Sequence, residues 1–178
     1  MAKTQASPAG PPDIQQPIST GDAGAPRVRL TIEGGVRGEE YRFHFEAAAG
    51  GGLAYGLRSE LTGRQIPDAI SRVEPAQFER LLRTAEPGRL KRAQRSRLPP
   101  IPPCSLVGRL EVFDGAERVQ VVFMADPEQA RQAGHRTPPA VRRAVDRIYA
   151  LAATEMRLKS AADVRPYYVE TKRPRRRR

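Results

Sequence analysis

The sequence is poor in cysteine, in aromatic residues and in long apolar runs, and each shortage excludes a class of protein. Its 178 residues include one cysteine and no tryptophan, and aromatic residues make up 6% of the chain. A single cysteine cannot build an intramolecular disulfide framework or a zinc site made of several cysteines. No run approaches the ~18 consecutive apolar residues of a membrane-spanning helix. The sequence therefore predicts neither a disulfide-rich domain nor a membrane span.

Basic residues are in excess, and the two ends of the chain carry little that could be buried. Lysine and arginine number 31 against 20 acidic residues, for a net charge of +11. Residues 1–26 are rich in proline and glycine, and residues 159–178 end in a cluster of arginines. Such segments bury too little apolar surface to offset the entropy of ordering them. We predict disordered tails at 1–26 and 159–178, a single domain at 27–158, and, without a secretory signal, a cytoplasmic location.

Alternating apolar and polar residues predict three strands in the first part of this domain. The alternation covers residues 27–33, 41–47 and 53–58, and glycines lie between the segments. Period-two alternation is typical of strands with one buried face. Gly50–Gly52 precede a strand rather than a helix, which favours a hairpin turn over a phosphate-binding loop. The three strands are predicted to form an antiparallel meander with one solvent-exposed side.

Two helices are predicted from apolar residues at spacings of three and four. The first covers residues 75–85, with proline in its first turn and Pro87-Gly88 after its end. The second begins at Thr137–Pro138, as N-cap and first position, and continues to Met156. The segment that precedes the second helix, residues 126–137, is predicted to be a polar loop that could include one short helical turn.

The middle of the chain combines a basic segment with the clearest hairpin of the sequence. Residues 89–103 carry five basic residues followed by four prolines, and we interpret them as an extended basic connection. Residues 106–113 and 118–124 alternate around Asp114-Gly115, a strong turn signal. The expected fold is α+β, in the order β-β-β-α-β-β-α: an antiparallel sheet of about five strands with two helices on one face.

No specific catalytic motif is present. His44 lies on the polar face of a predicted strand, His135 in a polar loop, and Cys104 at a strand start, where a buried or half-buried thiol is expected. Two histidines and one cysteine are too few to indicate a metal site. We therefore predict a non-enzymatic protein with no catalytic residue, no cofactor and no metal.

The basic segments are the remaining candidates for partner binding. They favour an acidic protein partner, because positive charge attracts it and speeds the encounter. The alternative is non-specific binding of a nucleic-acid phosphate backbone. The candidate residues are Arg89, Lys91, Arg92, Arg95, Arg97, Lys172, Arg173, Arg175, Arg176, Arg177 and Arg178.

Four segments resemble one known family in their order. A first strand running into Gly-Gly (RVRLTIEGGVRG, 27–38) precedes a helix VEPAQFERLLRTA (73–85). A hairpin LEVFDGAERVQVVF (110–123) and a closing helix PPAVRRAVDRIYALAA (138–153) follow. This layout resembles the emfourin-type domain, whose known members inhibit thermolysin-like metallopeptidases. The resemblance covers about residues 27–158 and implies a small α+β domain that acts by binding, as an inhibitor or adaptor of another protein.

Overall fold

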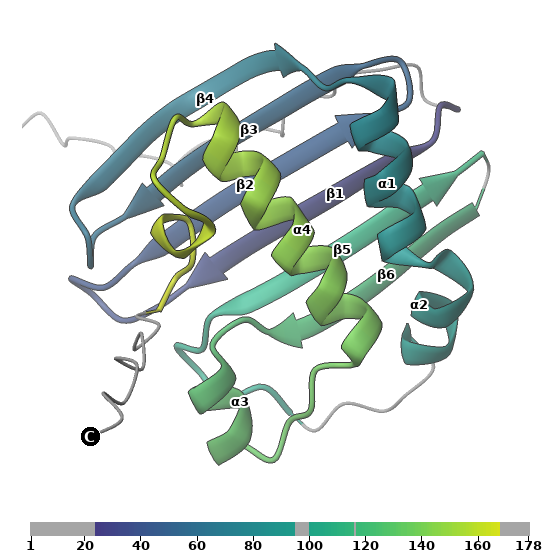
Figure 1. The fold of residues 1–178 in the computed structure, drawn as a ribbon. Coiled ribbons are helices and arrows are strands. Elements are labelled where there is room, and N and C mark those ends of the chain that lie inside the picture. Colours follow the sequence, from purple (N-terminus) through teal and green to yellow (C-terminus); the bar gives the residue numbers. More distant parts are fainter. Residues whose placement is uncertain (1–23, 95–99, 116, 168–178) are drawn as a thin grey trace, which may run out of the picture.

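The computed structural model describes residues 24–94, 100–115 and 117–167, and within them six strands form one sheet. Every neighbouring pair is antiparallel, in the order β4-β3-β2-β1-β5-β6 (Figure 1). The predicted α+β class and antiparallel sheet are therefore confirmed. The strands are β1 (Arg27–Gly34), β2 (Tyr41–Ala48), β3 (Gly52–Ser59), β4 (Arg64–Arg72), β5 (Val107–Asp114) and β6 (Glu117–Met124).

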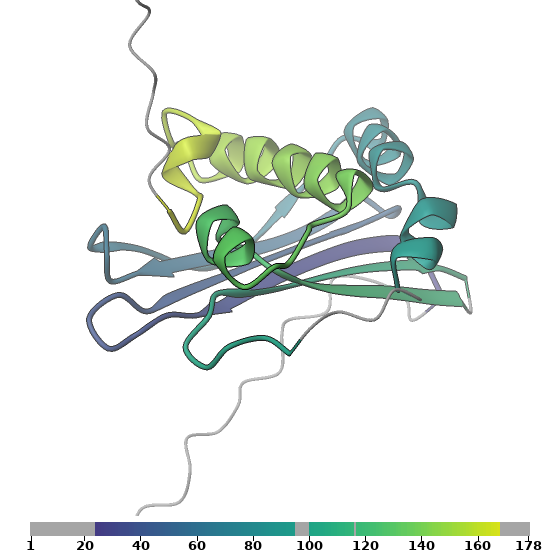
Figure 2. The same ribbon diagram turned by 90° about the horizontal axis from the view of Figure 1, so that it is seen from below.

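The helices lie over one face of this sheet (Figure 2). The longest one, α4, crosses the sheet diagonally, with α1 beside it and α2 against β6 (Figure 1). Within the described residues, no helix is both long and apolar enough to cross a membrane. The helices are α1 (Pro75–Ala85), α2 (Pro87–Gln94), α3 (Pro127–Gln132) and α4 (Pro139–Glu155), and a single 3-10 turn, η1, covers Ala161–Asp163.

The core lies between the apolar face of the sheet and α4. Leu30 and Phe45 point toward the helices and are fully buried, as is Ile148 of α4. The rings of Phe43 and Tyr149 meet with their centroids 5.7 Å apart. Each fully buried apolar side chain of this size contributes about 2 kcal/mol relative to exposure. The apolar residues that alternate along the strands and those that recur every three or four positions along α4 therefore pack in one apolar layer.

The opposite face of the sheet carries a row of paired charges, which we call the charge ladder. It runs across β2, β1, β5 and β6 through Glu46, Arg29, Glu111 and Arg118. The Arg29 guanidinium lies 2.6 Å from Glu46 and 3.6 Å from Glu111, and Arg118 pairs with Glu111 on the other side. Both carboxylates are almost fully buried, at 3% exposed. The ladder therefore keeps both buried carboxylates paired on the face of the sheet that no helix of the described residues covers.

The sixth strand, β4, was not predicted. It lies at the edge of the sheet, and most of its residues are exposed or only half-buried. Pro67 has no N–H to donate, which an edge strand tolerates on its outer side. The pairing register with β3 also shifts between Tyr55 and Leu57. A strand that buries neither face fully shows little alternation, so its sequence gives a weak signal.

The prediction of an extended basic connection is wrong for residues 89–94, which belong to α2 (Pro87–Gln94). Glu86 takes a left-handed conformation, with φ of 43°, and turns the chain between the two helices. The backbone N–H groups of Arg89 and Leu90 then donate to the Glu86 carbonyl. Leu90 is fully buried. Pro87 therefore begins a second helix, which the burial of its own residue Leu90 stabilises. The sequence suggested only that α1 ends here.

Three further differences concern the segment after the hairpin. A short helix, α3, forms in the predicted loop, and its N-cap Asp126 accepts from the backbone N–H of Glu128 at 2.8 Å. The N-cap of α4 is Pro138, one residue later than predicted. Residues 161–167 fall in the predicted C-terminal tail but pack on the domain, where Val164 is fully buried. The tail predictions for 1–23 and 168–178 lie outside the described residues.

Candidate functional site

The basic residues predicted to bind a partner are only partly available. On α2, Arg89 pairs with Glu86 and Lys91 pairs with Glu117. Arg92 is exposed and has no ion pair with any described residue. Two of the three α2 cations therefore hold the helix to its surroundings. The other predicted residues lie outside the described residues: Arg95, Arg97, Lys172, Arg173, Arg175, Arg176, Arg177 and Arg178.

His44 lies on the sheet face opposite the helices, as predicted, but it is half-buried rather than solvated. Its Nδ1 lies 3.7 Å from Oδ1 of Asp68, two strands away. Gly56 on the strand between makes this possible, because a Cβ there would come within 2.4 Å of both side chains. Burial lowers the pKa of His44 from 6.5, and the nearby Asp68 carboxylate opposes this shift. Burial outweighs the carboxylate, so the site favours a neutral histidine at pH 7.

The second histidine and the cysteine lie elsewhere. His135 is buried, not exposed in its loop, and its Nε2–H donates to the Pro100 carbonyl at 3.4 Å. Cys104 is exposed with a φ of 61°, so the prediction of a buried or half-buried thiol is wrong. In the described part of the chain, no hydrogen bond joins His44, His135 and Cys104. Nor does that part bring together three or more side chains suited to a metal ion.

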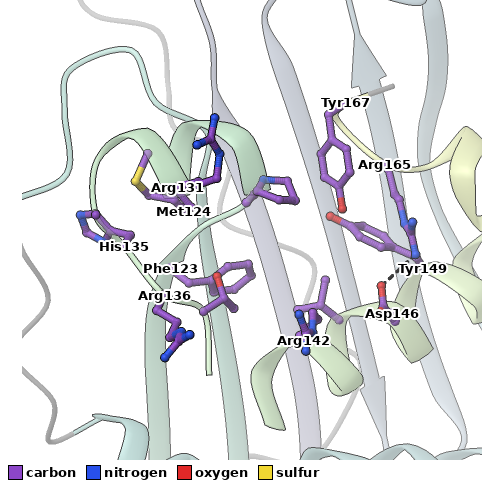
Figure 3. Close-up of a pocket in the computed structure, with 16 residues that line it drawn as sticks. Phe123, Met124, Arg131, His135, Arg136, Arg142, Asp146, Tyr149, Arg165 and Tyr167 are labelled. Atoms are coloured by element: carbon purple, nitrogen blue, oxygen red, sulfur yellow. Dashed lines mark hydrogen bonds and ion pairs between the residues drawn. The ribbon is translucent and has the colours of Figure 1, made fainter. Parts of the chain in front are cut away.

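A cavity of about 610 Å³ opens between α3, α4, the end of β6 and residues 165–167 (Figure 3). Four arginines line it, and we call it the arginine groove. Its lining includes three buried apolar side chains, which we call the floor: Phe123, Met124 and Val145. The Phe123 ring lies across Gly108 of β5, where a Cβ would come within 2.3 Å of the ring. The depth of the groove at this point therefore depends on a glycine in the neighbouring strand.

The cations of the groove are only partly balanced by acidic side chains. Arg131 and Arg165 each have a carboxylate partner, which for Arg165 is Asp146 at 2.9 Å. Arg136 and Arg142 are exposed and form no ion pair with any residue that the structure describes. Both line the cavity. The groove is therefore an electropositive hollow above an apolar floor.

Hydrogen-bonding groups complete the lining. The hydroxyl groups of Tyr149 and Tyr167 point toward one another in Figure 3. Burial raises the pKa of both phenols, so they remain protonated and able to donate at neutral pH. Arg165 and His135 each hold a buried nitrogen without a hydrogen-bond partner among the described residues. Unpaired buried polar groups are costly, and two of them occur in the lining of one cavity.

Sequence reasoning did not find this site. Tyr149 is buried and Arg142 is exposed on α4, as expected for a helix with one apolar face. No local motif joins them to Phe123 or Tyr167, because the groove depends on how distant segments pack. No protein-family model matches the sequence, and no curated protein matches it. The geometry of the arginine groove is therefore the observation that bears most directly on function.

Proposed function

We propose that this chain is a non-enzymatic binding domain that holds an acidic segment of another protein in the arginine groove. The observation that carries the proposal is the placement of two unpaired cations, Arg136 and Arg142, around a cavity with an apolar floor. A guanidinium binds a carboxylate through two parallel hydrogen bonds. An apolar side chain next to that carboxylate would cover the floor. The positive charge would also speed association with an acidic partner.

The size of the groove favours a short segment as its occupant. Its volume of about 610 Å³ lies within the range of pockets that enclose a ligand. A few side chains fill such a volume. A peptide also supplies acceptors and donors, which suits a lining that contains the Tyr167 hydroxyl and the exposed guanidinium groups of Arg136 and Arg142.

The resemblance to the emfourin-type domain supplies one partner class for this proposal, a thermolysin-like metallopeptidase. Full-length chain would be added to such a peptidase acting on a fluorogenic peptide. An inhibitor lowers the rate in proportion to its concentration, whereas an adaptor binds the peptidase and leaves the rate unchanged.

Fluorescence anisotropy with a fluorescein-labelled peptide, in which one phenylalanine lies between two glutamates, tests the groove itself. The double variant Arg136→Gln/Arg142→Gln should weaken binding at least about tenfold, because it removes both unpaired guanidinium groups. The matched control is Arg80→Gln/Arg83→Gln on α1, which removes the same charge from exposed arginines that do not line the groove. This control should change the affinity less than about twofold.

Equal losses in the two variants would contradict the proposal, because only net charge would then matter. A gel shift with random single-stranded and duplex DNA across a salt series addresses the alternative. If the logarithm of the DNA affinity falls with the logarithm of the salt concentration with a slope that corresponds to several phosphate contacts, and the groove variant binds DNA equally well, non-specific binding of the phosphate backbone would be favoured instead.

A further inference from the structure

The arginine groove continues into a second hollow at one of its ends. This hollow has a volume of about 530 Å³ and shares Pro127, Arg131 and Tyr167 with the groove. In Figure 3, Arg131 and Tyr167 lie toward one end of the groove, and Arg136 and Arg142 lie toward the other. A segment bound in the groove can therefore continue past Tyr167 into the second hollow.

The second hollow has the opposite charge. Its remaining lining residues are Asp126 and Glu128, and we call it the acidic hollow. Asp126 is the N-cap of α3, and the backbone N–H groups of Glu128 and Gln129 both donate to its Oδ1. Its Oδ2 has no hydrogen bond with any residue that the structure describes. The acidic hollow therefore offers carboxylate oxygens to a cation.

One ion pair connects the two cavities. Arg131 lines both of them, and its side chain pairs with Glu128 of the same short helix. The Arg131 side chain is 74% exposed, and that of Glu128 is 58% exposed. An ion pair this exposed is weak, because water screens both charges. A ligand that brings a carboxylate to Arg131 and a cation to Glu128 can therefore replace it.

We propose that the acidic segment carries a lysine or arginine about three residues from its apolar anchor, and that this cation binds in the acidic hollow while Arg131 binds the carboxylate beside the anchor. This inference rests on the proposed function and specifies the order of charges in the partner. Cavities of these volumes are each about 10 Å across, and an extended chain covers about 3.4 Å per residue, so about three residues separate the two positions. Because the acidic hollow lies at one end of the groove, only one direction of the partner chain fits.

Fluorescence anisotropy with labelled peptides and the full-length chain tests this order of charges. The parent peptide contains Glu-Phe-Glu, and two others add a lysine three residues before or three residues after the phenylalanine. A glutamine at each of these positions gives the uncharged controls. One lysine peptide should bind about threefold more tightly than its glutamine control, as expected for one exposed ion pair, and the other should show no gain.

Two variants of the ion pair should have opposite effects. Glu128→Gln should abolish the lysine gain and bind the parent peptide at least as tightly, because Arg131 loses its competing partner. Arg131→Gln should weaken the parent peptide about threefold and keep the lysine gain, because Glu128 remains. The matched control for Glu128→Gln is Glu79→Gln on α1, which removes the same charge from an exposed residue that lines neither cavity and should keep the gain. Binding of the parent peptide shows that the groove of each variant is folded.

The inference would be overturned if neither lysine peptide gained affinity, if both gained equally, or if the gain survived in Glu128→Gln. The proposed function would stand in each of these cases as long as Arg136→Gln/Arg142→Gln still weakened binding of the parent peptide. If that double variant bound the parent peptide as tightly as the unmodified chain, the proposed function itself would fail.

Discussion

The charge ladder and the arginine groove use the same residue type in opposite ways. In the ladder, Arg29 lies between Glu46 and Glu111, and Arg118 closes the row, so every guanidinium has a carboxylate beside it. In the groove, Arg136 and Arg142 border a cavity without such a partner among the described residues.

The difference separates charges that maintain the fold from charges available to a ligand. A carboxylate that is 3% exposed, such as Glu111, is stable in its charged form only when it is paired. An exposed arginine with no partner costs the fold little and keeps its hydrogen-bonding capacity for another molecule. Pairing, rather than the number of basic residues, therefore indicates where an acidic partner would bind.

The largest effect on stability is expected at the centre of the ladder. Arg29→Met keeps the length of the side chain but removes the cation that the buried carboxylates of Glu46 and Glu111, on the two neighbouring strands, share. Removing one partner of a buried ion pair is strongly destabilising, and we expect a loss of about 3 kcal/mol in the free energy of unfolding. Urea denaturation at pH 7 measures it. An unchanged midpoint would show that the ladder does not stabilise the sheet.

A smaller loss is expected at the end of the ladder. The Arg118 side chain is 54% exposed, and Glu111 keeps Arg29 at 3.6 Å when Arg118 is removed. Arg118→Ala should therefore lower the free energy of unfolding by about 1 kcal/mol. The same urea experiment provides the comparison with Arg29→Met. A loss as large as that of Arg29→Met would mean that the exposure of an arginine does not determine how much it contributes to stability.

The unpaired arginines of the groove should contribute little to stability, unlike the arginines of the ladder. Arg136→Gln/Arg142→Gln is expected to change the free energy of unfolding by less than about 0.5 kcal/mol, because neither side chain is buried or paired within the described residues. Thermal unfolding followed by circular dichroism measures this. A marked fall in the melting temperature would assign these arginines to the fold and remove the contrast with the ladder.

The smallest effect concerns His44, next to the ladder on β2. Because burial lowers the pKa of His44 from 6.5, the unfolded chain binds the proton more readily than the folded one. Its contribution to stability is therefore complete above pH 6.5 and is lost as the pH falls below that value. His44→Asn should reduce the decline in stability between pH 7.5 and 5. A His44 pKa above 6.5 by NMR titration would contradict this expectation.

The sequence predicted the elements that show a clear apolar pattern of their own. It missed those that form through contacts with a neighbouring strand or helix. The alternation in β1 and the apolar stripe of α4 report which face is buried, and both elements form as predicted. The strand at 64–72 buries neither face fully, so it shows no such pattern. The helix at 87–94 has one fully buried residue, Leu90, and one apolar position cannot reveal a period. The groove has no sequence signal of its own, because its lining comes together only when α3, α4 and residues 165–167 pack.

Gly108 offers a way to change the selectivity of the proposed site without replacing any residue that lines it. The glycine lies under the Phe123 ring, and that ring forms part of the groove floor. Adding a single methyl group at position 108 would displace the ring and so change the shape of the proposed binding site. If the groove holds its partner as proposed, a substitution inside the sheet could thus change which apolar side chain fits, while Arg136 and Arg142 stay the same.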